Sequence, residues 1–174
     1  KVPTAVPLGT SDLADNIITV DKLATTLDLS GNTITLPSGV GGKVLQVVST
    51  TNTGSADSST TTIVEFMNLS ITPSSASSKI MCFYQCVGYA NGTNNALLVR
   101  LYRGTIAGTQ IASTENADGG NSYEGYSLAL SNLDSPSTTS AQQYTIGFGA
   151  TQNLYHVIGF SSHSNTLTLM EIAG

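Results

Sequence analysis

The chain has 174 residues and a formal net charge of −5, and only 10% of its residues are charged, against about 25% in ordinary soluble proteins. Its six lysines and arginines are scattered along the sequence. This argues against nucleic-acid binding, because displacing counterions from phosphates takes clustered basic residues. No run of about 18 consecutive apolar residues is present, so we expect no membrane insertion.

Residues 1–41 are predicted to form an N-terminal arm or stem segment. Val20, Leu23 and Leu27 fall at helical spacing. The preceding segment, residues 12–17, which ends at Ile17, is loosely similar in sequence. One or two isolated helical turns are unstable in water, so this apolar stripe must be buried against something else. The partner is either further copies of the chain or, as the alternative, the chain's own folded domain. Since the chain begins at Lys1, we expect a processed chain or a piece of a longer one.

From residue 42 onward the sequence predicts short strands at regular intervals, with no convincing helix. Turn signals include Asn91-Gly92, Gly104 and Ser135-Pro136. The expected strands cover residues 43–50, 61–72, 79–90, 97–103, 109–114, 124–132, 142–150, 155–161 and 166–172. This pattern predicts an all-β fold, an antiparallel β-sandwich or jelly-roll-like knob spanning residues 42–174.

Two kinds of strand are expected in this knob. Met67, Leu69 and Ile71 alternate with polar residues, which predicts one buried and one solvated face. The segments 80–89 and 97–102 are instead apolar on both faces. A strand of this kind in an antiparallel sandwich needs a second cover. A neighbouring subunit is the simplest cover, which predicts an obligate oligomer, and a loop of the same chain is the alternative.

The two cysteines, Cys82 and Cys86, lie within one predicted strand. Four residues at about 3.3 Å each place their Cα atoms about 13 Å apart, while a disulfide needs roughly 4.4–6.8 Å. We therefore expect two buried, reduced thiols, which fits assembly in a cytoplasm.

Signals for catalysis are weak, and we expect neither an enzyme nor a bound metal or cofactor. The sequence lacks the Gly-x-Ser-x-Gly nucleophile motif, phosphate-binding loops and zinc patterns. His156 shares a predicted strand face with Ile158 and Phe160, which indicates a core or interface histidine. Asp134 precedes Ser135-Pro136 and is expected to anchor that turn through its own side chain.

Binding needs only a shaped surface, and the segment from Thr114 to Tyr126 offers suitable side chains. Aromatic rings beside amides and carboxylates are what a sugar site uses. The candidate receptor-binding residues of this loop are Glu115, Asn116, Asp118, Asn121, Tyr123 and Tyr126. A similar loop contains Tyr89, Asn91, Thr93, Asn94 and Asn95. The alternative for both is an ordinary polar hairpin with tyrosines packed at its base.

Three phrases of the sequence carry a family resemblance: residues 67–80, residues 133–141 and residues 167–174. With these phrases, the segment from Gly42 to Gly174 resembles the C-terminal β-domain of tailed-phage fibre and appendage proteins, a type common in phages of marine bacteria. The resemblance implies a virion structural protein, assembled in the host cytoplasm as a homotrimer through the stem residues. Its N-terminal arm would join other virion proteins, and its distal knob would contact a host surface glycan or protein.

Two other interpretations stay open at this point. The chain would be a capsid-decorating head fibre if the N-terminal arm is inserted into the shell. It would be a free trimeric carbohydrate-binding jelly roll if it acts outside a virion.

Overall fold

The computed structural model describes residues 43–117, 125–160 and 163–174, which form strands and connecting loops without a helix. The predicted stem residues Ile17, Val20, Leu23 and Leu27 lie outside the described residues, so the division at residue 41 stays a prediction. The strands are β1 (Val44–Asn52), β2 (Ala56–Ser58), β3 (Val64–Ile71), β4 (Lys79–Ala90), β5 (Ala96–Arg103), β6 (Thr109–Ala117), β7 (Tyr126–Asp134), β8 (Gln142–Ala150), β9 (His156–Ile158) and β10 (Asn165–Ile172).

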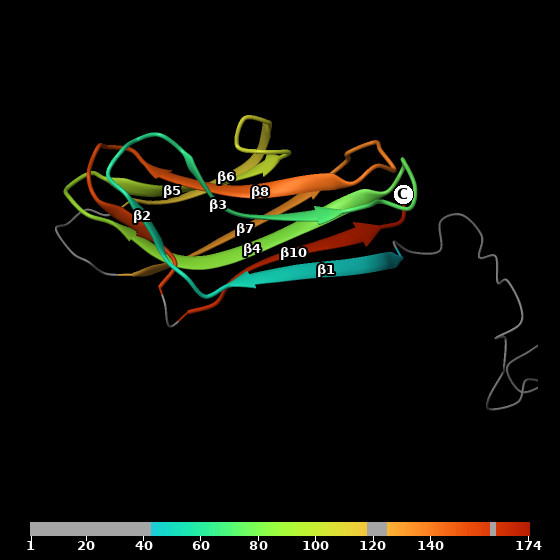
Figure 1. Cartoon of the computed structure of the whole chain (residues 1–174), viewed down its shortest axis with the longest axis horizontal. Helices are drawn as coiled ribbons and strands as arrows, with labels where there is room; N and C mark the ends of the chain where they lie inside the picture. The colour runs from blue at the N-terminus through green and yellow to red at the C-terminus, as the bar shows by residue number, and fades with distance from the viewer. Residues whose placement is uncertain (1–42, 118–124, 161–162) are drawn as a thin grey trace, which may run out of the picture. The chain divides into compact units, whose positions relative to one another are not determined.

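The strands form two antiparallel sheets packed face to face (Figure 1). One sheet has the order β1-β10-β4-β9-β2, with β7 also paired to β4, and the other has the order β3-β8-β5-β6. β10 pairs with β4 through residues 79–85 and β9 pairs with it through residues 88–90, so β9 continues the line of β10. Two four-strand layers, β1-β10-β4-β7 and β3-β8-β5-β6, are the arrangement of a jelly roll. The predicted fold class is confirmed.

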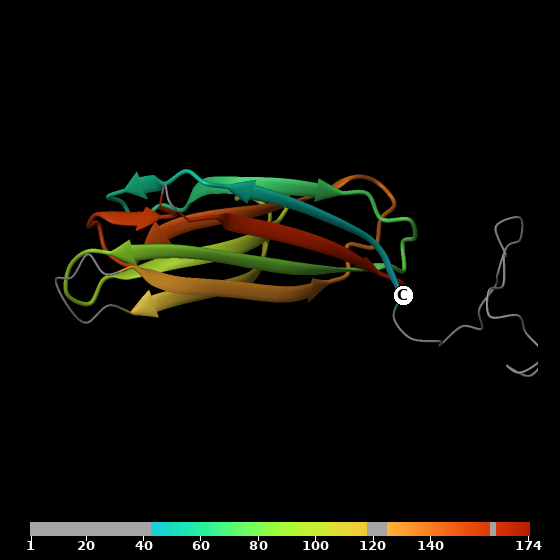
Figure 2. The same cartoon turned by 90° about the horizontal axis from the view of Figure 1, so that it is seen from below.

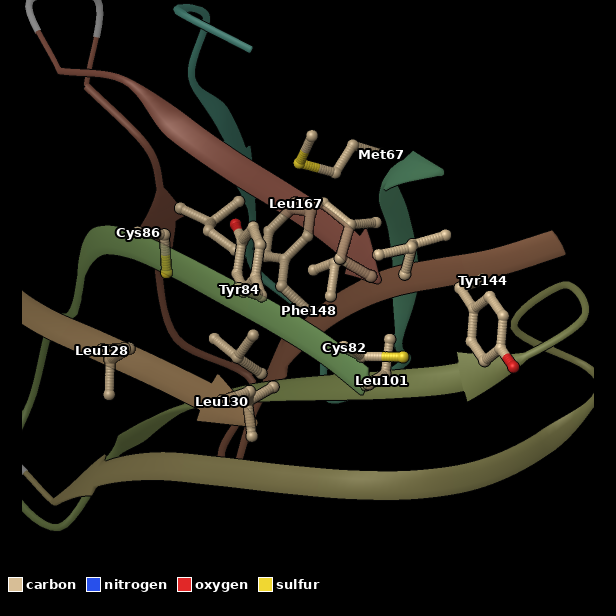
Figure 3. Packing of buried hydrophobic residues seen from close by; sticks show 14 of the residues in the cluster. Met67, Cys82, Tyr84, Cys86, Leu101, Leu128, Leu130, Tyr144, Phe148 and Leu167 are labelled. Atoms are coloured by element: carbon tan, nitrogen blue, oxygen red, sulfur yellow. The ribbon is translucent and has the colours of Figure 1, made fainter. Parts of the chain in front are cut away.

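The core lies between the sheets and follows the predicted alternation. Met67 and Ile71 of β3 are buried, while Asn68 and Ser70 between them are exposed. Figure 3 shows side chains from both sheets converging on this space. Its largest fully buried hydrophobic side chains are Tyr144, Phe148, Ile80, Leu97, Leu101, Ile146, Ile158, Leu167 and Leu169. Alternation works here because successive side chains of a strand point to opposite faces of the sheet.

Cys82 and Cys86 are both free and both buried in β4, facing the core on either side of Tyr84 (Figure 3). Burial raises the pKa of Cys86 to about 11. For Cys82, burial and the nearby charge of Asp134 raise the pKa to about 12. The extended strand expected from the sequence is therefore present, with neutral thiols inside the sandwich.

The four-stranded sheet receives part of its second cover from the same chain. Ile63, in the segment before β3, lies over β8, and an added Cβ at Gly147 would come within 2.7 Å of its Cγ2 atom. An added Cβ at Gly149 would come within 2.7 Å of Ile63 Cδ1. Tyr102 on the outer face of β5 is also buried. The cover of this side therefore comes in part from the same chain, as in the intrachain alternative, while Leu98 and Arg100 on the outer face of β5 are half-buried.

Several strand predictions differ from the structure. β3 begins at Val64 rather than residue 61, β6 ends at Ala117 rather than residue 114, and β7 ends at Asp134 rather than residue 132. The three-residue strand β2 was not expected, because the sequence Ala-Asp-Ser shows no alternation. β9 ends at Ile158 rather than residue 161, because Gly159 adopts a φ of 73°. Such a backbone conformation belongs to a turn and suits glycine.

Candidate functional site

The two ends of the sandwich have different roles in the chain's path (Figure 1). At one end the chain enters β1 and leaves β10, and Ala173 N donates a 2.9 Å hydrogen bond to Lys43 O. The opposite end, here called the far end, carries the β4–β5 loop, the β8–β9 loop and the start of β7. Gly88 pairs with both Tyr126 and Ile158 there. The far end is thus the one that the chain presents away from its entry point.

Two loops of the far end are fixed to each other through Asn95, which is fully buried. Asn95 Oδ1 accepts a 3.0 Å hydrogen bond from Gln152 N, and Asn95 Nδ2 donates a 2.9 Å bond to Asn91 O. Gln152 Nε2 in turn donates to the carbonyls of Thr93 and Asn94, at 3.2 and 2.8 Å. The amide of Asn95 therefore has a structural role, because its hydrogen bonds hold the two loops together.

An aromatic cluster lies beside these loops. The rings of Tyr89 and Phe160 are stacked, with centroids 5.9 Å apart, and Tyr89 also lies 6.3 Å from Tyr155. His163 meets Phe160 edge-on at 5.8 Å. Tyr89 is buried, whereas Tyr155 is 39% exposed and its neighbour Leu154 is 40% exposed. Tyr89 packs at the base of its loop, as the structural alternative predicts. Tyr155 and His163 are the exposed rings of the cluster.

The predicted receptor-binding loop is described only at its two ends. Glu115 is exposed on β6 opposite Leu98, and Asn116 Oδ1 accepts a 3.1 Å hydrogen bond from Leu97 N. Tyr126 is half-buried at the start of β7. Asp118, Asn121 and Tyr123 lie outside the described residues. β6 and β7 place both ends of this loop at the far end, and its role in recognition stays a prediction.

Three of the buried polar side chains, Asp134, Glu171 and His156, stand out by their place in the sandwich. Asp134 accepts a hydrogen bond from Tyr144 and pairs with Arg103, so its carboxylate links the sheets instead of anchoring the turn as the sequence predicted. Glu171, fully buried, accepts bonds from Gln46 Nε2, Ser74 N and Ser74 Oγ at 2.6–2.7 Å. His156 is buried with its Nδ1 atom 2.9 Å from Leu154 O, which confirms the core position expected for it.

Neither a metal site nor a membrane span is found in the described parts of the chain. No group of three or more histidine, cysteine, aspartate or glutamate residues comes together there as a metal site would require. No helix in those parts is long and apolar enough to cross a bilayer.

Comparisons with known proteins complete the description. No protein-family model matches the chain, and no curated protein matches it. Similar solved structures include the infectious bursal disease virus VP2 subviral particle, with 11% identity and a TM-score of 0.45 over 87% of this chain and 47% of that one. A second is the T13 particle of the same virus, with 12% identity and a TM-score of 0.46 over 87% and 45%. A third is the Gx strain, with 9% identity and a TM-score of 0.45 over 80% and 40%. The chain spans less than half the length of these three chains.

Proposed function

We propose that the protein is a virion structural protein, a homotrimeric fibre or appendage of a tailed phage whose far end contacts the host surface. The single observation that supports this most is the separation of roles between the two ends of the sandwich. The chain enters at one end, where Lys43 and Ala173 are joined. The far end carries the loops fixed by Asn95 and the exposed side chains of Leu154 and Tyr155.

This arrangement suits a knob carried on a stem. The strands are committed to the core, so recognition falls to loops that a rigid framework positions. A host surface glycan or protein is the proposed ligand, since exposed aromatic rings stack on sugar C–H groups and neighbouring polar groups fix hydroxyls. The segment from Thr114 to Tyr126, whose two ends lie at the far end, is the proposed main contact. The N-terminal arm, residues 1–41, is proposed to join the knob to other virion proteins.

Labelling of intact particles tests this function. Antibodies raised against the purified chain and coupled to gold are expected to mark appendages of the particle, away from the head shell. Gold spread over the head would assign the chain to capsid decoration and contradict the host-contact role. A purified particle preparation that contains none of the chain by immunoblot would overturn the virion role altogether.

A further inference from the structure

One row on the outward side of the layer β1-β10-β4-β7 is apolar across all four strands. The pairing register places Val47 beside Met170, Met170 beside Met81, and Met81 beside Leu133. In the next row Phe83 lies between Thr168 and Ser131. Val47, Leu133 and Phe83 are 53%, 51% and 43% exposed. These two rows, with the groove of about 470 Å³ beside Phe83, are called the outer face below. Figure 2 shows the four strands of this layer side by side.

The outer face also lacks charge. Beyond the two rows, the next paired row contains Thr51, Thr166, Gln85 and Ala129. Among the described strands of this sheet, two charged side chains lie on this side, both outside the two rows. Lys79 is paired with Ile172 at the start of β4, and Asp57 of β2 lies in line with Val157 and Tyr89 near the far end. The four-stranded sheet differs, since its outward side carries Glu65, Arg100 and Glu115 and is partly covered by Ile63.

We infer that the outer face is where this chain packs against other copies of itself. The inference rests on the proposed homotrimer and says which surface builds it. Copies with a net charge of −5 repel one another, so they can meet at lowest cost where each presents an uncharged surface. Charged partners such as nucleic acid or a basic protein would find no complementary group on this face. The hydroxyl groups of Ser49 and Thr168 are hydrogen-bonded to each other at 3.0 Å. A second copy could therefore cover them without leaving either group unpaired.

The size of the outer face is sufficient for such contacts. Strands of eight residues, the length of β10, extend about 26 Å, and four strands spaced about 4.8 Å apart cover about 19 Å. The whole outward side of the layer, of which the outer face is the apolar part, therefore measures roughly 500 Å². Two copies that meet across all of it bury roughly 1,000 Å², the area at which specific interfaces begin. Large apolar patches on a surface mark such interaction sites.

Light scattering on the full chain tests the inference. The wild type is expected to have about three times the mass of one 18.0 kDa chain. Phe83→Glu combined with Leu133→Glu places two like charges per copy in the interface, and the mass is expected to fall threefold to that of one chain. Ser131→Glu changes an exposed polar residue beside Phe83, so it should dissociate the oligomer without touching the core. Leu154→Glu is the matched control, because Leu154 is as exposed as Phe83 but lies at the far end, and its mass should stay that of the wild type.

The outcomes separate this inference from the proposed trimer. A wild-type dimer that these variants dissociate supports the inference and contradicts the trimer. An oligomer that survives both outer-face variants, with circular dichroism showing a folded chain, overturns the inference and leaves the trimer standing. A wild type that is monomeric at all concentrations overturns both.

Discussion

Tyr144 donates a 2.8 Å hydrogen bond to Asp134, and this bond joins the two sheets, since Tyr144 belongs to β8 and Asp134 to β7. Arg103 of β5 completes the link with an ion pair of 3.0 Å to the same carboxylate. Asp134 is 6% exposed, so its negative charge depends on these two partners for the solvation that water would otherwise supply.

Replacing Tyr144 with phenylalanine should destabilise the domain without changing its shape. The buried carboxylate of Asp134 would lose one of its two partners, and hydrogen bonds to charged groups contribute about 1.5–3 kcal/mol. Urea unfolding is expected to show a free energy of unfolding that is lower by about that amount, with an unchanged dependence on urea concentration. In a double-mutant cycle with Asp134→Ala, which removes the acceptor, the effects of the two substitutions should be less than additive, because both remove the same bond. Additive losses would contradict the link.

Glu171 is expected to make the stability of the domain fall at acidic pH. Burial alone would raise the pKa of its carboxyl, but hydrogen bonds from Ser74 and Gln46 outweigh burial and lower the pKa from 4.5 to about 2. A group with a depressed folded-state pKa stabilises the protein above its unfolded pKa, and this contribution is lost as pH falls toward the folded value. The melting temperature should therefore fall between about pH 4.5 and pH 2, as followed by circular dichroism.

Glu171→Gln removes this titrating group and should flatten that part of the pH profile, at the cost of lower stability at pH 7. Glu115→Gln is the matched control, because Glu115 is exposed, and it should leave the profile as it is in the wild type. An equally steep acid decline in Glu171→Gln would show that other carboxyl groups cause it.

The thiols of Cys82 and Cys86 should be unreactive while the domain is folded. Their burial disfavours the thiolate, and their pKa values are raised to about 12 and about 11, whereas the thiolate is the reactive form. A colorimetric thiol reagent at pH 8 is expected to label neither residue in the native chain and both in denaturant. A cysteine introduced at Thr139, in an exposed turn, supplies the reactive control. Fast native labelling of either natural cysteine would show that the sandwich opens readily.

Replacing Asn121 and Tyr123 together with alanine should reduce adsorption of particles to host cells. These residues belong to the loop proposed as the main host contact, and loss of a stacking ring and a hydrogen-bonding amide weakens each of three copies at once. Adsorption is measured as the fraction of particles removed by cells over time. Thr139→Ala, at the opposite end of the sandwich, is the control and should adsorb normally. Unchanged adsorption by the double variant, with the oligomer intact, would contradict the receptor assignment.

Local features of this fold could be predicted from the sequence, and long-range ones could not. The alternation of Met67, Leu69 and Ile71 identifies a half-buried strand because the period of a strand is two. The pairing of Val47 with Met170 is invisible at that level, since it joins residues at opposite ends of the domain. Cover for β8 also escaped prediction, because it depends on Ile63 folding back over Gly147 and Gly149.

The candidate site shows the same division. The sequence indicated that His156 belongs to the core, from its neighbours on one strand face. It did not indicate that Asn95 joins two loops, because its partner Gln152 lies 57 residues away. Nor did it indicate the role of Tyr155, whose exposure depends on where Tyr89 and Phe160 pack. Asparagines and tyrosines of these loops look alike in the sequence. Long-range contacts decide which of them are buried and structural and which are accessible to a ligand.

The position of β10 has a consequence for synthesis of the protein. This strand lies between β1 and β4, yet it follows every other described strand in sequence. At about 5–20 residues per second, a ribosome that has finished β1 needs on the order of ten seconds before it reaches Leu167. During that interval β1 has no partner and β4 lacks one of its neighbours, so the nascent chain presents unpaired strand edges to its surroundings. The yield of folded protein would then depend on whether a chaperone, or another nascent chain translated from the same mRNA, covers these edges.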